Sequence, residues 1–578
     1  YSVKPTDGSG DFTFTRGSNL SATRVDASQL IEKGRENYVT YSQDFSQWPL
    51  AGAATRTLGV TDPNGGTTAA TISNIPSGNN SDGIILQSQP MVLAAGNVVC
   101  QSIYLKGSGT IAVAMERSLG GSYFFESSIV TLTSEWQRFN HFAVINSPAA
   151  GFSYYVTNKN GTTATSVDVA FAQFEFGTAP TAYIPTNSSA VTAGILENTP
   201  RFDYSGGATC PSLLLEPSRT NLVPQSEYLA SFSGFGITIT TNYGISPEGV
   251  KNATRFQTNA GVRGVIYDGV PVVNGSTYIL SMYVKSLSGN QKVRIGADLG
   301  CTNPQGAETF DVGTEWIRVE TTITSSQSSW NVFIDNVESG INCTGTYLAA
   351  DLLIYGFQCE QGSYATSYIP TYGVSQTRAY DVCIDAGDAS TFNSTEGVLF
   401  AEVSSFAANL GTSKYSPINL TGGSGDFIMF RAQGGSSNRY YFFIYVNNVE
   451  KMIFNIVIDD ATSVNKFAMR YSASGTSVYI NGVKVYTDSV PILFPVNTLT
   501  NLRFEQGSDY FKGKVNQTLV FPTALSDLDL AILTGASATR IDRAGLIVKG
   551  RENLLLQSNQ FDTTWGKSNT SITSGQSG

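Results

Sequence analysis

Apolar and polar residues alternate along the chain in short runs that turn residues interrupt. The even-numbered residues from Tyr278 to Val284 are large and apolar, a period of two that predicts a strand with one buried face. Residues 62–65 read Asp-Pro-Asn-Gly, a turn signal between two such runs. No helix of ten or more residues is indicated between 37 and 371. The pattern predicts an all-β protein made of tandem β-sandwiches of the jelly-roll type.

Residues of about 397–524 show the same periodicity but a different sequence. Residues 478–485 predict a hairpin, because Asn481 and Gly482 are the residues that a type I′ turn prefers. Downstream, Ser526 can cap a short helix over 527–533 that ends at Gly535. We expect a third sandwich here, with this helix after its last strand.

Short segments recur along the chain, and we call them straps. Residues 21–37 return as 537–553, with Ser-Ala-Thr-Arg and Lys-Gly-Arg-Glu-Asn in both copies. A third copy covers 201–221, and a partial fourth copy covers 377–381. Repetition at this scale indicates a chain built of duplicated units.

Two longer segments between the straps also match each other. Glu-Trp-x-Arg occurs at 135–138 and 315–318, and Tyr-Ile-Pro-Thr occurs at 183–186 and 368–371. These segments predict two copies of one module. The expected divisions are strap 1–36, module 1 over 37–186, strap 187–220, module 2 over 221–371, strap 372–396, the third sandwich over 397–535, strap 536–553, and the start of a further module over 554–578. We expect the chain to continue at both ends.

Composition narrows the classes of function. The chain has 578 residues, and 45 Asp and Glu outnumber 35 Lys and Arg, which argues against nucleic-acid binding. No apolar run is long enough for a membrane span, so we expect no membrane insertion. Six cysteines are too few for a disulfide scaffold, although Cys301 and Cys343 could pair. This amino-acid composition is typical of an extracellular or particle-borne protein.

The amino-acid sequences of the straps resemble those of virion structural proteins of tailed bacteriophages, which are fibre-like. It includes residues 11–16 (Asp-Phe-Thr-Phe-Thr-Arg), 200–203 (Pro-Arg-Phe-Asp) and 212–217 (Ser-Leu-Leu-Leu-Glu-Pro). The repeated modules, which end in sequences such as 365–371, resemble jelly-roll carbohydrate-binding modules. The third sandwich resembles laminin-G-like or concanavalin-like domains, but 515–517 read Val-Asn-Gln where such relatives often carry an acidic pair.

Sugar binding needs flat aromatic faces with amide, carboxylate or guanidinium groups beside them. Each candidate aromatic has the alternative of facing the core, as adjacent rings in a strand face opposite ways. The candidates are Tyr123, Phe124, Tyr154 and Tyr155 in module 1, Trp330, Asn331 and Asp335 in module 2, and Arg439, Tyr440 and Tyr441 in the third sandwich.

The straps repeat an Arg-x-Asn motif at Arg35/Asn37, Arg219/Asn221 and Arg551/Asn553. It could bind a ligand. A structural role is the simpler interpretation, because a guanidinium can tie down loop carbonyls while asparagine holds a turn. The straps would then set the angle between modules or between chains.

Catalysis and metal binding have little support in the sequence. His141, the single histidine, lies in an apolar strand-like context where a half-buried structural role is expected. Asp381, Asp385 and Asp388 could offer oxygen ligands to Ca²⁺, but a solvated linker is the simpler interpretation. We expect no enzyme activity, no cofactor and no resident metal.

The resemblance and the pattern together lead to one functional expectation. The chain is expected to be a virion protein in a fibre or appendage, which binds host-surface glycans, contacts other virion proteins and forms a homotrimer. The trimer is implied by the fibre resemblance alone. Two alternatives stay open: a structural capsid or tail decoration without glycan binding, and accessory modules of a secreted polysaccharide-degrading enzyme.

Overall fold

The computed structural model describes the chain from residue 12 to 549, with internal gaps. It leaves out the side chains of Tyr123 and Phe124, and it leaves out Cys301, Cys343, Arg551 and Asn553 entirely. The described ranges are 12–78, 82–87, 91–119, 122–149, 151–297, 305–336, 346–408, 415–422, 425–432, 438–507, 509–535, 539–541 and 547–549.

The chain divides into two compact units. The double-module unit is Phe14–Val382, and the C-terminal unit is Cys383–Gly578 together with Tyr1–Thr13. Strands dominate both units, and the expectation of an all-β, multi-domain protein of tandem β-sandwiches is confirmed. No helix in the described ranges has the length and apolar character to cross a membrane.

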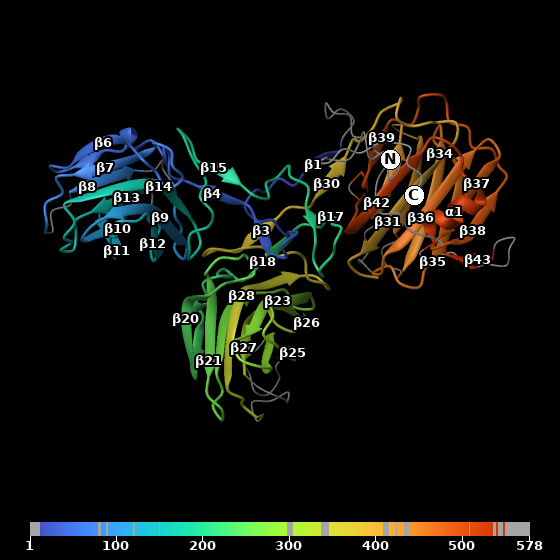
Figure 1. Cartoon of the computed structure of the whole chain (residues 1–578). Coiled ribbons are helices and arrows are strands. Elements are labelled where there is room, and N and C mark those ends of the chain that lie inside the picture. The colour runs from blue at the N-terminus through green and yellow to red at the C-terminus, as the bar shows by residue number, and fades with distance from the viewer. Residues whose placement is uncertain are drawn as a thin grey trace. The chain divides into compact units, whose positions relative to one another are not determined.

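Module 1 is a sandwich of two five-stranded antiparallel sheets, drawn blue to teal in Figure 1. Apart from the hairpins β6–β7 and β10–β11, successive strands switch between the two sheets, as in a jelly roll. One sheet has the order β11 (Ser122–Thr131), β10 (Thr110–Leu119), β13 (Phe152–Thr157), β8 (Gly83–Gln87) and β5 (Leu50–Ala51). The other has the order β12 (Gln137–Val144), β9 (Val98–Gly107), β14 (Ser166–Phe176), β7 (Ala69–Ser73) and β6 (Thr55–Val60).

Module 2 repeats this topology strand for strand, in green to yellow. Its first sheet has the order β25 (Gln305–Val312), β24 (Gln291–Ala297), β27 (Ser329–Asp335), β22 (Val265–Pro271) and β19 (Ser233–Phe235). Its second has the order β26 (Ile317–Thr324), β23 (Thr277–Ser286), β28 (Ala350–Gln361), β21 (Ala253–Thr258) and β20 (Ile237–Gly244). One-turn 3₁₀ helices lie at Phe45–Gln47 and Leu229–Ser231. The identical strand order agrees with a duplicated module, while the domain boundaries stay predictions.

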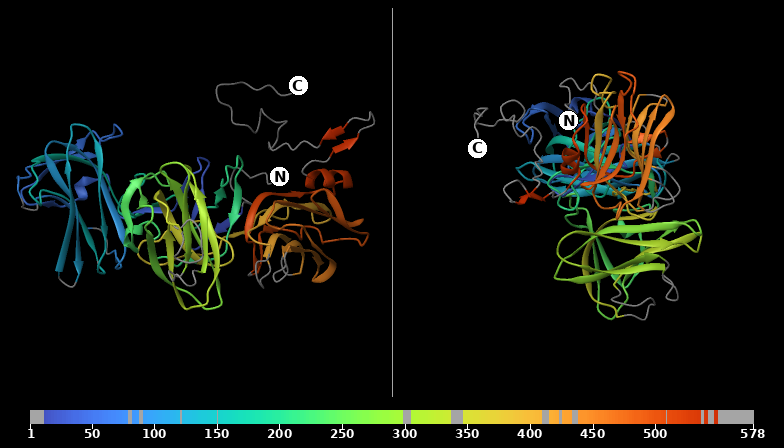
Figure 2. Two further views of the ribbon diagram at one scale, coloured as in Figure 1. Left: turned by 90° about the horizontal axis from the view of Figure 1, so that it is seen from below. Right: turned by 90° about the vertical axis from the view of Figure 1, so that its right-hand side faces the viewer.

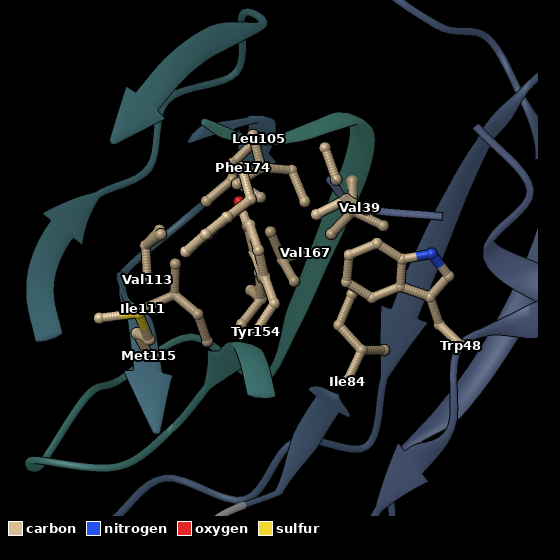
Figure 3. Close-up of a cluster of buried hydrophobic side chains, with 14 of the residues drawn as sticks. Val39, Trp48, Ile84, Leu105, Ile111, Val113, Met115, Tyr154, Val167 and Phe174 are labelled. Carbon is tan, nitrogen blue, oxygen red and sulfur yellow. The ribbon is translucent and has the colours of Figure 1, made fainter. Parts of the chain in front are cut away.

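The core of each module lies between its two sheets. In module 1 it contains Trp48, Met115, Tyr154 and Phe174, which Figure 3 shows packed among aliphatic side chains. In module 2, Tyr278, Leu280, Met282 and Val284 of β23 face the core as the alternation predicts, but the other face is not exposed, since Ile279 and Ser281 are also buried. Burial of apolar surface of this extent is the main stabilising contribution to each module.

Residues of the straps pair in short antiparallel ladders. β2 (Thr23–Val25) pairs with β3 (Ile31–Lys33), and β16 (Phe202–Asp203) pairs with β17 (Ser212–Leu215). β4 (Arg35–Asn37) pairs with β15 (Val191–Ala193), and β18 (Arg219–Asn221) pairs with β29 (Gln376–Arg378). Strands β1 (Thr13–Thr15) and β30 (Val382–Ile384) lie at the division between the units.

The C-terminal unit contains the third sandwich, drawn orange to red in Figure 2. One sheet has the order β35 (Val449–Val457), β34 (Arg439–Val446), β33 (Phe427–Ala432), β32 (Tyr415–Thr421) and β39 (Asn501–Arg503). The facing sheet includes, in order, β42 (Gly513–Phe521), β31 (Gly397–Ser405), β36 (Asn465–Ser472), β37 (Gly475–Ile480) and β38 (Val483–Asp488). Short ladders join β40 (Glu505–Gln506) to β41 (Asp509–Tyr510), and β43 (Thr539–Ile541) to β44 (Ile547–Lys549).

Two local predictions in this unit are confirmed. Asn481 and Gly482 have φ angles of 48° and 87°, so both occupy the left-handed region that a type I′ turn requires. Helix α1 (Asp527–Thr534) begins at Ser526, whose Oγ accepts a hydrogen bond from the backbone N–H of Asp529 at 3.2 Å. Leu530 of this helix packs on the outer face of the sheet that contains β31 and β36.

Candidate functional site

Strand β34 places alternate side chains on opposite faces of its sheet. The even-numbered residues Tyr440 and Phe442 face the interior, where the ring of Tyr440 lies 4.8 Å from that of Phe467 in the opposite sheet. The hydroxyl oxygen of Tyr440 lies 2.9 Å from Ser405 Oγ, so its polar end is satisfied inside the sandwich. The prediction that Tyr440 binds sugar is wrong, because the side chain is only 1% exposed.

The odd-numbered residues of β34 form an aromatic row on the outer face. The row consists of Tyr441, Phe443 and Tyr445, with Phe427 of β33 stacked on Tyr445 at 4.8 Å between ring centroids. The rings of Tyr441 and Phe443 are nearly parallel, with 5.8 Å between centroids and 11° between planes. Phe443 is mostly covered, whereas the other three rings are half-buried, so part of each remains accessible.

Cationic and polar groups border the aromatic row. The guanidinium of Arg431 lies 4.3 Å from the ring centroid of Phe443 and 5.8 Å from that of Tyr441. Burial lowers the pKa of Arg431, and the neighbouring Asp509 partly opposes this. Beyond Tyr441 on β34, Arg439 Nη1 donates to Asn455 Oδ1 at 2.7 Å.

Edge strand β35 extends this surface. Val457 lies opposite Arg439 and Ile453 lies opposite Phe443, and these two aliphatic side chains are 53% and 39% exposed. A sheet face that combines flat rings, aliphatic groups, a guanidinium and an amide can stack against the apolar face of a pyranose ring and bind its hydroxyl groups. Arg439 and Tyr441 were predicted from the sequence, but Phe443, Tyr445, Phe427 and Arg431 were not. An extension of the alternation along β34 would have added Phe443 and Tyr445.

Module 1 carries a second mixed surface on the outer face of β10, β11 and β13. Tyr155 lies beside Phe125, with 5.8 Å between their centroids, and its hydroxyl donates to Glu116 Oε1 at 3.1 Å. Tyr155 is only 7% exposed, so the prediction that its ring stacks on a sugar is wrong. Lys159 Nζ lies 4.2 Å from the centroid of Phe125. Neighbouring Tyr154 is buried in the core between the sheets, so its predicted binding role is wrong (Figure 3). Tyr123 and Phe124 lie in β11, but their side chains fall outside the described part of the chain.

The candidates in module 2 do not form an accessible sugar site. Trp330 is 1% exposed and packs edge-on against Tyr278 in the core, so its predicted role is wrong. Asp335 is fully buried, and its carboxylate accepts hydrogen bonds from Arg294 at 3.0 and 2.6 Å and from Arg263 at 3.2 Å. Of the three candidates, Asn331 is the exposed one, because it lies on the opposite face of β27 from Trp330.

The Arg-x-Asn motifs separate into two kinds of side chain. Asn221 is buried, its Nδ2 donates to the carbonyl groups of Phe357 and Ile369, and its Oδ1 accepts from the backbone N–H groups of Val223 and Cys359. Asn37 makes the equivalent four bonds in module 1, to Ala172, Ile184, Val39 and Phe174. Arg35 and Arg219 are partly exposed, while Arg551 and Asn553 lie outside the described residues.

The three aspartates considered for Ca²⁺ have separate partners. Asp381 binds the guanidinium groups of Arg16 and Arg201, whereas Asp385 pairs with Arg503 at 2.9 Å. Asp388 accepts hydrogen bonds from Ser390 and Thr391. Among the described residues, no three His, Cys, Asp or Glu side chains converge as a metal site.

His141 lies within hydrogen-bond distance of one serine. Its Nδ1 is 3.0 Å from Ser128 Oγ, and its buried Nε2 has no hydrogen-bond partner within the described ranges. Burial lowers the pKa of His141, although Glu126 opposes the shift, so the ring is neutral at pH 7. The pair lacks the third group that would orient the histidine as a catalytic base.

Comparisons with known proteins add little to this geometry. No protein-family profile matches the chain, and no curated protein sequence matches it significantly. A tandem pair of CBM22 modules from Paenibacillus barcinonensis is similar over 60% of this chain and all of that one, at 11% identity and a TM-score of 0.23. Mouse laminin α1 domains LG4-5 match 51% of this chain and 92% of that one, at 8% identity and a TM-score of 0.17. A Trypanosoma rangeli sialidase matches 83% and 98% of the two chains, at 7% identity and a TM-score of 0.22. At such TM-scores the likeness decides neither fold nor ligand, and the sandwich assignment rests on the strand pairing.

Proposed function

We propose that the chain is a non-enzymatic virion protein of a tailed bacteriophage, located in a fibre or appendage, whose β-sandwiches bind host-surface glycans. The observation that carries the glycan-binding part is the aromatic row on the outer face of β33 and β34. The phage part rests on the resemblance of the strap sequences. The proposal includes contacts with other virion proteins and a homotrimeric assembly, which would present several copies of each surface.

The chemistry of the aromatic row suits a neutral or weakly charged sugar chain. Residues two apart on a strand are spaced by about 6.6 Å. Tyr441 and Tyr445 therefore lie about 13 Å apart on either side of the mostly covered Phe443, and each ring can stack against a sugar unit of the same chain. Arg431 and Arg439 would donate hydrogen bonds to hydroxyl groups at the border. Each contact is weak, and repeated copies would gain affinity through effective concentration.

A structural decoration protein is the second candidate. It is favoured by the burial of Trp330, Tyr154 and Tyr440, three of the aromatics that the sequence pointed to as ligands. In that case the aromatic row would contact a neighbouring protein in the particle instead of a sugar.

Retention on immobilised host-surface polysaccharide tests the proposal. We expect Tyr441→Ala combined with Tyr445→Ala to weaken retention of the full chain by about tenfold, as each lost stacking contact is worth about 0.5–1.5 kcal/mol. The matched control is Tyr243→Ala, which removes a 42% exposed tyrosine that also lies against an arginine, Arg255. Equal loss in the control, or undiminished retention in the double variant, would contradict the proposal.

Two further measurements test the non-enzymatic and the virion parts of the proposal. Release of reducing ends from the polysaccharide would show an enzyme and overturn the non-enzymatic part. Absence of peptides of this chain from purified virions of the source phage would overturn the virion part.

A further inference from the structure

Among the strap residues whose side chains the structure describes, all basic side chains but two, at equivalent positions, are paired with carboxylates. The paired ones are Arg16 with Asp381, Arg24 with Glu32, Lys33 with Glu227 and Glu248, Arg201 with Glu216 and Asp381, and Arg378 with Glu216. The exceptions are Arg35 and Arg219, the arginines of the two described Arg-x-Asn motifs. In a chain with an excess of acidic residues, an unpaired arginine at a repeated position points to a ligand.

Arg219 is held in place without a counter-charge. Its Nη1 donates to the carbonyl oxygen of Ser218 at 3.2 Å, and its Nε is buried without a hydrogen-bond partner in the described part of the chain. The guanidinium lies directly on Gly362, where a Cβ atom would come within 2.9 Å of Nη2. The ring centroid of Tyr364 lies 5.3 Å from the guanidinium carbon. These contacts fix the cation in one position.

A cavity of about 600 Å³ opens beside Arg219 in module 2. Leu222, Pro271 and Val273 form an apolar wall, and Thr220 and Gln361 add polar groups. Among the described residues that line it, Arg219 is the single charged one. The backbone N–H of Val273 donates to the hydroxyl of Tyr278 at 2.8 Å, which anchors the wall to the core. The volume is within the range of small-ligand sites and accommodates one or two sugar units.

The equivalent cavity at Arg35 has a different charge. It measures about 140 Å³, and its described lining includes Glu36 and Glu175 as well as a second cation, Lys33. Arg35 Nη1 donates to the carbonyl oxygen of Ala182 at 3.3 Å. Because two acidic residues balance the two cations of that lining, we expect this cavity to attract an anion less strongly than the cavity at Arg219.

We propose that the Arg219 cavity is a binding site for a sugar that carries a single negative group, a carboxylate or a sulfate. The guanidinium binds the anionic group through two hydrogen bonds, and the apolar wall contacts the C–H face of the ring. The class of ligand rests on the proposed glycan binding, but the site is separate from the aromatic row and belongs to the double-module unit.

A ligand-observed NMR titration of the full chain tests the site. The probes are glucuronate, glucose 6-sulfate and glucose, so that the two anionic groups are compared with each other and with a neutral sugar. We expect at least one anionic sugar to bind at least tenfold more tightly than glucose. Arg219→Gln should remove that preference, while Arg255→Gln, which removes a paired surface charge of the same module, should keep it.

A second variant keeps the test informative if Arg219→Gln does not fold. Val273 is 61% exposed, so Val273→Asp adds a negative charge at the wall without disturbing the core. It should weaken binding of the anionic sugar and leave glucose unchanged. Equal affinity for all three sugars, or an anion preference that survives both Arg219→Gln and Val273→Asp, would overturn the inference.

The aromatic-row variant keeps this test independent of the glycan-binding proposal. Tyr441→Ala with Tyr445→Ala should leave glucuronate and sulfate binding at Arg219 unchanged. If it abolishes that binding, the anion preference belongs to the aromatic row, and the inference about Arg219 is wrong.

Discussion

At the scale of the residue, one asparagine connects each of modules 1 and 2 to the strap that precedes it. Asn221 uses both hydrogens of its amide and accepts two backbone N–H groups, so it satisfies four backbone groups that would otherwise be buried without partners. Asn37 repeats this arrangement in module 1. An aspartate has no amide hydrogens to donate and an alanine has neither function, which gives a physical reason for the repetition of asparagine in the motif.

Replacement of Asn221 by alanine should therefore destabilise module 2. Each unsatisfied buried backbone group costs about 1–3 kcal/mol, and partial rehydration reduces the total, so we expect the free energy of unfolding to fall by about 3 kcal/mol. Urea unfolding followed by tryptophan fluorescence measures the change. Asn331→Ala, at an exposed position of the same module, is the matched control and should change stability by less than about 0.5 kcal/mol. Similar losses in both variants would contradict the role given to Asn221.

At the scale of the element, the straps are joined by a buried cluster of charges. Glu216 directly follows β17 in the strap between modules 1 and 2. It binds Arg201 at 2.7 Å and Arg378 at 2.9 Å, and it also accepts hydrogen bonds from Ser367. Asp381 binds Arg16 and Arg201. The cluster joins three strap segments that are far apart in the sequence to the end of module 2. Its members are nearly inaccessible, so the removal of one leaves a partner charge buried without compensation.

Glu216→Gln should destabilise the double-module unit by about 3–5 kcal/mol, the usual cost of breaking one side of a buried ion pair. The matched control is Glu32→Gln, at the equivalent place in the first strap, where the pair with Arg24 is partly exposed. That change should cost at most about 1 kcal/mol. Thermal unfolding of the two variants compares them directly, and equal shifts would contradict the importance given to burial.

The same glutamate predicts a pH dependence. Burial raises the pKa of Glu216, but the guanidinium groups of Arg378 and Arg201 outweigh this and lower it to about 2, below its ordinary 4.5. Its contribution to stability is therefore complete above pH 4.5 and is lost as the pH falls toward 2. Unfolding free energies measured at steps from pH 5 to pH 2 should decline for the wild type. The part of this decline that belongs to Glu216 should be absent in Glu216→Gln.

At the scale of the whole molecule, repetition is the main feature. Two modules share one strand order, and each is followed in sequence by strap residues that enter the same charge cluster. The proposed function would gain from such an arrangement, because weak sites on several modules act together through effective concentration.

The proposed homotrimer gives a direct prediction at this scale. Sedimentation equilibrium of the purified chain should give a mass of about 185 kDa, three times the 61.8 kDa of one chain. Retention on a dense polysaccharide surface should also exceed retention of the same chain on sparsely coated beads. A single species of 61.8 kDa at micromolar concentrations would contradict the trimer.

The sequence alone determined the local elements and the repetition. The alternation of β23, the Asn481–Gly482 turn and the Ser526 cap depend on residues within a few positions of one another, so their conformations could be predicted without the fold. The duplicated strand order likewise follows from repeated sequence segments.

Only the tertiary structure decided which side chains are available to a ligand. Tyr440 and Tyr441 are adjacent in sequence, and which of the two rings is buried depends on the side from which the second sheet packs. The pairing of Arg16 with Asp381 joins residues 365 positions apart, which no local pattern specifies. Arg219 differs from the strap arginines that pair with carboxylates for the same reason. Contacts between distant segments of the chain decide whether a cation lies beside a carboxylate or beside an open cavity.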